Sequence, residues 1–300
     1  MLYDLFVGEI LNGIHNLDIK YLTEIRLRVG LPIVIEISGK RCYLASYGMT
    51  DSLNSAIICD RSTIDRVVSI ASNNSIHTIN DQLVNGYIVY RGGIRIGVAG
   101  EFVYVNDKIK TIKNIQALNI RVPHEVKGCS LRAIDNIVHN GRIYNTLVIS
   151  PAGAGKTTFI RDLAKQILRL QPKSNVLIVD ERCEITGVNN GNVAFADMNC
   201  DILSNCAKDY AFSNGIRSLR PDVIVTDELS IADLPAVEYA MTCGVKVIAT
   251  IHASSLIDLK NKPQICDILD KHLFDRFVLL GSTPGEYNGV YDANFECIAL

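Results

Sequence analysis

Residues 146–158 read TLVISPAGAGKTT, and this stretch decides the fold class of the chain. Its first four residues are apolar or β-branched, and its end opens a helical pattern that continues to Leu170. From Ser150 to Thr157 it matches the phosphate-loop pattern G-x-x-x-x-G-K-[ST] except at the first position, where serine replaces glycine. A buried strand that turns sharply into a helix presents free backbone N–H groups to phosphate oxygens. The stretch therefore predicts a nucleotide triphosphate site.

Each residue type in this loop has a chemical task. Gly153 and Gly155 let the backbone approach a phosphate without a clash from Cβ. We expect Lys156 to reach the β- and γ-phosphates, Thr157 to bind Mg²⁺ and Thr158 to lie near the α-phosphate. The expected cofactors are ATP and Mg²⁺. The expected nucleotide-binding set is Ser150, Pro151, Ala152, Gly153, Ala154, Gly155, Lys156, Thr157 and Thr158.

A second buried strand should carry a carboxylate to the magnesium ion. Residues 221–228, PDVIVTDE, place Asp227 and Glu228 directly after an apolar run. We expect Asp227 to hold Mg²⁺ through water and Glu228 to polarise the attacking water as the catalytic base. Residues 176–181, VLIVDE, offer a rival strand with the same ending. Glu181 is therefore expected to support catalysis, and the choice between the two acidic pairs stays open.

Polar residues also follow a further apolar run that ends near Thr250 and His252. A residue in this place suits a sensor of the γ-phosphate, so His252 is a candidate catalytic residue, although a lone histidine is as often structural. Arg217 and Arg220 precede the strand that ends at Asp227. They fit arginine fingers and solvated or ion-paired arginines equally well.

The order of strands and helices around these motifs predicts the architecture. Near-continuous β-branched runs indicate strands buried on both faces, which are typical of a parallel sheet covered by helices. We therefore expect an α/β fold, a RecA-like P-loop NTPase core with a mostly parallel sheet, in residues 126–300.

The part before this core has a different pattern. Between Gly86 and Val122 we expect short strands broken by glycines, at 87–90, 95–98 and 102–105, with a tight hairpin turn at 106–107. Residues 1–125 are therefore predicted to form a smaller α+β N-terminal domain without a catalytic constellation. Contacts with partners or with other copies of the chain are its expected task.

Composition limits the function classes. A net charge of −2 gives no general electrostatic reason for binding nucleic acid, so nucleic acid is not the expected partner. The nine cysteines are scattered without zinc-ligand spacing, which favours reduced thiols in a cytoplasmic protein. No run approaches the roughly 20 apolar residues that span a bilayer, so no transmembrane segment is expected.

The combination of motifs resembles a known family. Residues 217–228, RSLRPDVIVTDE, and 249–253, ATIHA, resemble the Walker B and histidine boxes of secretion-type ATPases, the hexameric motors of type II and type IV secretion and pilus assembly. Further stretches resemble the stage III sporulation protein AA family, namely residues 24–32, 86–97, 118–122 and 180–185. Two positions depart from the usual pattern: Ser150 replaces the first glycine, and Asp227 stands where secretion motors usually carry glycine.

This resemblance, and not the composition, implies a biological role. The family is expected to supply the mother-cell ATPase of a channel that links mother cell and forespore in endospore-forming bacteria. It implies an ATP-hydrolysing motor that forms a homo-oligomer, with a hexamer as the expected ring. It also implies small membrane proteins of a transenvelope channel as partners, which would hold the cytoplasmic protein at the membrane.

Two other function classes remain as alternatives. A nucleic-acid-dependent RecA-like translocase would use basic residues of the N-terminal domain to line a strand-binding groove, with Arg26, Arg28, Lys108, Lys110 and Lys113 as candidates. The net charge and the scarcity of aromatic residues among these cations count against it. A switch that binds nucleotide without turnover is the other class, and the presence of Glu228 counts against it.

Overall fold

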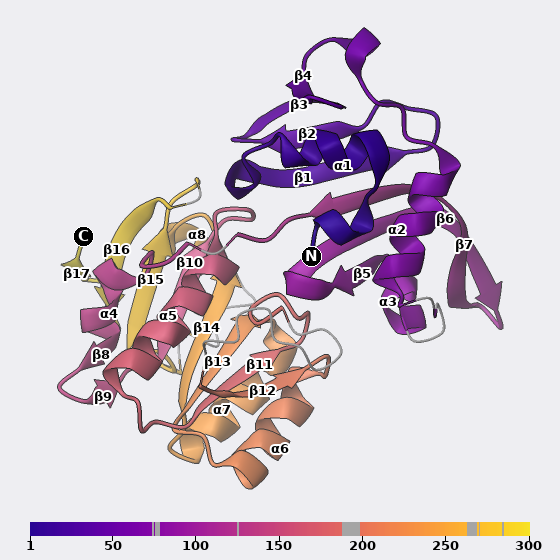
Figure 1. The fold of residues 1–300 in the computed structure, drawn as a ribbon. Helices are drawn as coiled ribbons and strands as arrows, with labels where there is room; N and C mark the ends of the chain where they lie inside the picture. The colour runs from indigo at the N-terminus through magenta and orange to yellow at the C-terminus, as the bar shows by residue number, and fades with distance from the viewer. Residues whose placement is uncertain are drawn as a thin grey trace. The chain divides into compact units, whose positions relative to one another are not determined.

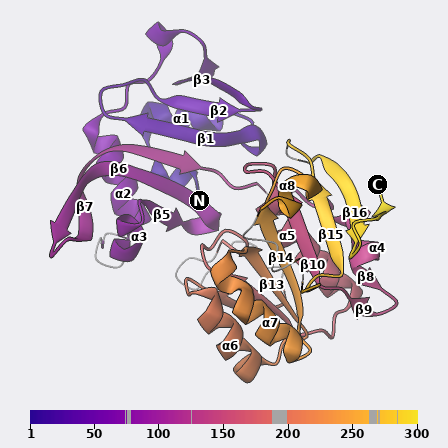
Figure 2. The same ribbon diagram turned by 180° about the vertical axis from the view of Figure 1, so that it is seen from behind.

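The computed structural model describes residues 1–73, 75, 79–124, 126–187, 199–262, 269, 271–283 and 285–300. The chain divides into two compact units, which Figures 1 and 2 show from opposite sides. The N-terminal unit consists mainly of Met1–His124. The C-terminal unit consists of the described residues from 126 to 186 and from 199 to 300.

The N-terminal unit is built on a seven-stranded antiparallel sheet with the order β4-β3-β2-β1-β7-β6-β5. Its strands are β1 (Leu22–Arg28), β2 (Val34–Ile37), β3 (Lys40–Ala45), β4 (Gly48–Thr50), β5 (Tyr87–Tyr90), β6 (Ile94–Val105) and β7 (Lys108–Arg121). Its helices are α1 (Gly8–His15), α2 (Arg61–Ala71) and α3 (Asn80–Val84), with short 3-10 turns at Tyr3–Leu5, Ile19–Tyr21, Leu53–Ser55 and Arg91–Gly93. Alternate residues of the strands, such as Ile25 and Leu27, are fully buried in one core with apolar residues of the helices.

The expected break between strands at 95–98 and 102–105 is wrong, because β6 runs without interruption from Ile94 to Val105. Gly100 lies at an irregularity in the pairing with β7, and a Cβ on it would come within 2.7 Å of the Lys113 carbonyl oxygen. Glycine inside a strand here marks a close backbone approach and not a strand end. The predicted turn at 106–107 is confirmed, since Asn106 and Asp107 have φ values of 51° and 59° between the paired strands.

The C-terminal unit is built on an eight-stranded sheet with the order β12-β11-β13-β14-β10-β15-β16-β17. Its strands are β10 (Thr146–Ser150), β11 (Val176–Asp180), β12 (Asp201–Ser204), β13 (Val223–Glu228), β14 (Lys246–His252), β15 (Arg276–Leu280), β16 (Tyr287–Asp292) and β17 (Cys297–Ala299). All pairings from β12 to β15 are parallel, and β16 and β17 add antiparallel strands at one edge. The prediction of a mostly parallel sheet is therefore confirmed. A separate two-stranded ribbon joins β8 (Val138–His139) to β9 (Arg142–Ile143).

Helices cover both faces of this sheet, as the alternation of buried residues requires. Val148 of β10 packs with apolar residues of α4 (Leu131–Ile137) and α5 (Lys156–Leu170). Its neighbours Leu147 and Ile149 pack in a second core with residues of α6 (Lys208–Leu219), α7 (Leu234–Thr242) and α8 (Leu256–Lys260). A short 3-10 turn at Ile231–Asp233 leads into α7. None of the helices in the described ranges combines the length and apolar character needed to cross a bilayer.

The strand order determines which motifs meet. The strands of the parallel part all point the same way, so their carboxyl ends lie at one edge of the sheet. β14 lies between β10 and β13. The end of β14 is therefore placed between the phosphate loop and the acidic pair at the end of β13.

Candidate functional site

The phosphate loop joins β10 to α5, as the sequence predicts. β10 ends at Ser150 and α5 begins at Lys156. Gly153 and Gly155 have φ values of 77° and 96°, a left-handed backbone that residues with a Cβ rarely adopt. Gly155 caps the amino end of α5 without a side-chain hydrogen bond, so the first N–H groups of a 15-residue helix are available to an anion.

Serine at the first loop position is compatible with this geometry. Ser150 is fully buried and is not among the residues with positive φ, so its place does not require glycine. Its hydroxyl donates to the Pro151 carbonyl oxygen at 3.0 Å. Its own carbonyl oxygen accepts from the backbone N–H of Ala253, just after β14, at 3.2 Å. The residue thus links the start of the loop to the neighbouring strand.

Lys156 lies folded over the loop. Its Nζ donates to the carbonyl oxygens of Ser150 and Pro151, each at 3.3 Å. Burial lowers the pKa of Lys156, while the nearby carboxylates of Glu228 and Glu184 oppose this shift. The ammonium group therefore faces acidic side chains from two other segments of the same sheet edge.

The acidic pair at the end of β13 consists of one buried and one exposed residue. Asp227 is 8 % exposed, whereas Glu228 faces solvent. Within the described ranges, the Glu228 carboxylate has no hydrogen-bond or ion-pair partner. Thr250 of β14 is buried and lies opposite Glu228 in the strand pairing. His252 lies opposite Ser150 and is exposed, so the sheet brings all these positions to one edge.

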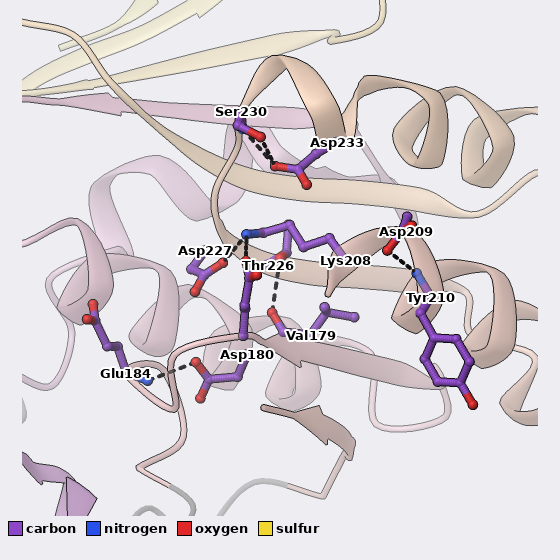
Figure 3. Close-up of polar contacts among 11 residues, drawn as sticks. Val179, Asp180, Glu184, Lys208, Asp209, Tyr210, Thr226, Asp227, Ser230 and Asp233 are labelled. Atoms are coloured by element: carbon purple, nitrogen blue, oxygen red, sulfur yellow. Dashed lines mark hydrogen bonds and ion pairs between the residues drawn. The ribbon is translucent and has the colours of Figure 1, made fainter. Parts of the chain in front are cut away.

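The rival acidic pair after β11 has a different environment. Asp180 is fully buried and accepts hydrogen bonds from the backbone N–H groups of Glu184, Ile185 and Thr186 at 2.8, 3.1 and 2.8 Å. It also accepts from the Thr186 hydroxyl at 2.7 Å. Figure 3 shows Asp180 turned toward Glu184, away from the Lys208–Asp227 contact. Asp180 therefore holds the loop 181–186 in place and has no free oxygen for a metal.

This loop is also held from the other side. Arg161 of α5 is buried and donates from Nη2 to the Glu184 carbonyl oxygen at 2.6 Å, and from Nε to the Ile185 carbonyl oxygen. The helix that begins at the phosphate loop is thereby tied to the segment that carries Glu184. Glu184 lies in residues 180–185, one of the stretches that resemble the family, and Arg161 lies in no such stretch; sequence reasoning gave neither residue a role.

We expect Asp180→Ala to destabilise the C-terminal unit strongly. Three buried donors and one partly buried donor would lose a charged acceptor, and such losses lower the free energy of unfolding by about 3 kcal/mol or more. Urea unfolding followed by circular dichroism measures the change. Asp135→Ala, at an exposed position of α4, is the control and should change stability by less than about 0.5 kcal/mol. A loss at Asp180 no larger than that of the control would contradict this role.

A buried lysine connects the two acidic pairs. Lys208 begins α6, its side chain is 4 % exposed, and its Nζ lies 2.8 Å from Glu181 Oε2 and 2.9 Å from Asp227 Oδ1. Burial raises the pKa of Asp227 to about 6, Lys208 opposes the shift, and Asp180 and Glu181 add to it. Burial alone would lower the pKa of Lys208, but the carboxylates of Asp227 and Glu181 raise it overall. No motif marks Lys208, and sequence reasoning missed it.

Asp227 has the properties required of a magnesium ligand. Its Oδ1 is buried, and the cation paired with it is Lys208 Nζ at 2.9 Å. A carboxylate oxygen is the kind of ligand that a hard cation such as Mg²⁺ prefers. Thr157, in the first turn of α5, supplies a hydroxyl at the same sheet edge. The residues present therefore fit Mg²⁺ bound together with nucleotide phosphates.

A small cavity opens beside the phosphate loop. Its volume is about 150 Å³, and its lining includes Ala154, Gly155 and Thr158 from the loop and first turn of α5. Cys129, Phe159 and Tyr287 supply apolar and aromatic surface. Burial raises the pKa of the Cys129 thiol to about 12, so this residue is neutral. The cavity offers mostly apolar surface, with Glu286 also in its lining, next to the place expected for an α-phosphate.

The two arginines that precede β13 do not lie at this edge. Arg217 and Arg220 are exposed at the carboxyl end of α6, which starts at the site with Lys208 and runs back along the sheet. Arg220 ends the helix with a φ of 50°, and its carbonyl oxygen accepts from the Asn175 side chain at 3.4 Å. Neither arginine therefore serves the phosphate site of its own chain.

The sequence matches the family model for sporulation stage III, protein AA, over residues 3–298. The chain belongs to this family. It is 31 % identical over 280 residues to stage III sporulation protein AA of Bacillus subtilis (strain 168), and the match covers 90 % of this chain and 87 % of that protein. The resemblance predicted from the sequence is thereby confirmed.

Two solved structures share the fold of this family member. The pilus retraction motor PilT, solved with bound ADP, aligns with a TM-score of 0.58 at 18 % identity, over 91 % of this chain and 78 % of that one. The ATPase DotB of Legionella pneumophila aligns with a TM-score of 0.52 at 15 % identity, over 89 % and 74 %. The mixed α/β architecture is therefore shared with these two proteins.

Proposed function

We propose that this family member binds ATP with Mg²⁺ and hydrolyses it as a secretion-type motor ATPase. One observation supports the proposal most strongly. Lys156, Asp227 and Glu228 lie at one edge of the parallel sheet, beside the amino end of α5, which has no side-chain cap. A cation, a buried carboxylate that can hold the metal and an exposed carboxylate that can act as the base are the three groups that attack of water on a γ-phosphate requires.

Each residue then has a defined part in the reaction. The N–H groups of the loop and of the first turn of α5 bind the phosphate oxygens, and Lys156 leaves the loop carbonyls to contact the β- and γ-phosphates. Thr157 and Asp227 hold Mg²⁺, which neutralises charge on the phosphates when bound. Glu228 orients the water and takes its proton. Thr250 and His252, at the end of β14, sense whether the γ-phosphate is present.

The cavity beside the loop is the proposed place of the adenine ring. Its apolar and aromatic lining suits a flat base, and Thr158 at its border leads to the α-phosphate. Residues Cys129 and Tyr287 would then contact the base. A neutral thiol at this place is compatible with an uncharged purine.

The membership of the family and the fold of PilT and DotB support a wider proposal. The chain works as a homo-oligomeric ring, with six subunits as the expected number, and the unit 1–125 contacts neighbours or partners. The partners are small membrane proteins of a transenvelope channel between mother cell and forespore, which hold this cytoplasmic protein at the membrane. Glu181, bound to Lys208, supports catalysis and does not act as the base.

The experiment that tests the function class is ATP turnover with and without single-stranded DNA or RNA. For a secretion-type motor, turnover by the full chain changes by less than about twofold when polynucleotide is added at saturating concentration, because no part of the site depends on it. Salt is kept low, so that weak phosphate contacts still register. Stimulation of about tenfold or more would favour the nucleic-acid translocase instead.

A further inference from the structure

The amino end of α6 places a buried cation between the two acidic strand ends. Lys208 Nζ contacts Glu181, which follows β11, and Asp227, near the end of β13. Figure 3 shows the lysine side chain extended toward Asp227. The helix is held close to the sheet, since a Cβ on Gly215 would come within 2.5 Å of a methyl carbon of Leu177. The position of Lys208 is therefore determined by packing as well as by charge.

The two carboxylates that Lys208 contacts differ in their exposure to solvent. The contact with Glu181 Oε2 is a hydrogen bond of 2.8 Å, and the Glu181 side chain is 41 % exposed. The contact with Asp227 Oδ1 is an ion pair of 2.9 Å, and the Asp227 side chain is only 11 % exposed. If Lys208 releases Asp227, its charge stays paired with Glu181.

A buried carboxylate beside other acids needs a compensating cation. Two cations close to one carboxylate repel each other, so Lys208 and Mg²⁺ are competitors for Asp227. We propose that Lys208 is a positioning residue that takes the place of the metal on Asp227 in the nucleotide-free subunit. When Mg²⁺ and nucleotide bind, Lys208 moves to Glu181 alone. This inference rests on the proposed nucleotide site. It adds that metal binding breaks the ion pair between Asp227 and Lys208, the first residue of α6.

The test is a magnesium titration of nucleotide binding, which does not depend on turnover. The full chain is mixed with a fluorescent, non-hydrolysable ATP analogue, and the Mg²⁺ concentration at half-maximal tight binding is measured. In Lys208→Met the competitor is removed, so this midpoint should fall by about tenfold or more. Lys173→Met, at an exposed lysine in the turn before β11, is the matched control and should keep the wild-type midpoint.

A second variant moves the midpoint the other way. In Glu181→Gln the lysine loses its alternative carboxylate and pairs with Asp227 alone, so about three- to tenfold more Mg²⁺ should be needed. A merely structural role of Lys208 would weaken metal binding in both variants, because both disturb the same cluster. The opposite directions are therefore the result that distinguishes competition from structural support.

The unfolding temperature gives an independent test of the role of Lys208. In the presence of EDTA, Lys208→Met should unfold at a lower temperature than the wild type, because Asp227 has lost its cation. Mg²⁺ with the analogue should raise the unfolding temperature of this variant more than that of the wild type. Equal or higher Mg²⁺ midpoints in Lys208→Met would overturn the inference while leaving the nucleotide site intact. Failure of the wild type to bind the analogue at any Mg²⁺ concentration would overturn the proposed function as well.

Discussion

Lys156→Ala lowers the affinity for ATP by about 10- to 100-fold, the value expected for the loss of charge-assisted contacts worth 1.5–3 kcal/mol. In the structure the ammonium group rests on the carbonyl oxygens of Ser150 and Pro151, at 3.3 Å from each. These neutral acceptors are weaker partners than phosphate oxygens, so Lys156 gains most of its interaction energy when the nucleotide binds. Isothermal titration with ATP and Mg²⁺ measures the change.

The fold should survive this substitution, because alanine favours the first turn of a helix and no buried ion pair is broken. Lys173→Ala, outside the site, is the control and should leave affinity unchanged. An affinity of Lys156→Ala within the error of the wild type would contradict the assignment of the loop as the phosphate site.

Glu228→Gln lowers ATP turnover by about 100-fold or more, the usual contribution of a positioned general base. The amide keeps the size of the side chain but does not accept a proton. Binding should change by less than about twofold, because an exposed residue that contacts only the water contributes little to ground-state affinity. The variant is thus expected to hold ATP without releasing phosphate, which separates the base from the phosphate-binding residues.

The comparison with Glu181→Gln decides between the two acidic pairs. Glu181 is bound to Lys208, so its loss at saturating Mg²⁺ should reduce turnover by less than about tenfold. Phosphate release in a single turnover measures both variants under the same conditions. Rapid release by Glu228→Gln together with a stalled Glu181→Gln would move the catalytic base to Glu181.

The sequence predicts the motif-bearing elements of the C-terminal unit well. β10 and β13 are apolar runs that end in polar residues, and α5 occupies 156–170 as its apolar spacing indicates. α6 escaped prediction because its middle holds serine, asparagine and glycine, which are weak helix formers. It is stabilised by tertiary packing, in which Gly215 lies against Leu177. Local propensity therefore failed where long-range contacts determine the helix.

The same limit applies to the candidate site. Motif spacing leads to Lys156, Asp227 and Glu228, because the chemistry requires those residue types after a strand. It does not lead to Lys208, which reaches the site only because α6 begins beside the ends of β11 and β13. Motif spacing also does not distinguish the acidic pair at the end of β11 from the acidic pair at the end of β13. The structure separates them, since Asp180 is saturated with hydrogen bonds from the loop 181–186, whereas Asp227 is paired with Lys208.

The measurement that tests the central claim most directly is phosphate release from Mg²⁺–ATP by the purified wild type, followed across a range of protein concentrations. Turnover per chain should be detectable and should rise with concentration, as expected if subunits must assemble to complete the motor. Omission of Mg²⁺ should abolish it, since Asp227 and Thr157 act through the metal. Tight ATP binding with no phosphate release at any concentration would contradict the account and leave a nucleotide-binding switch in its place.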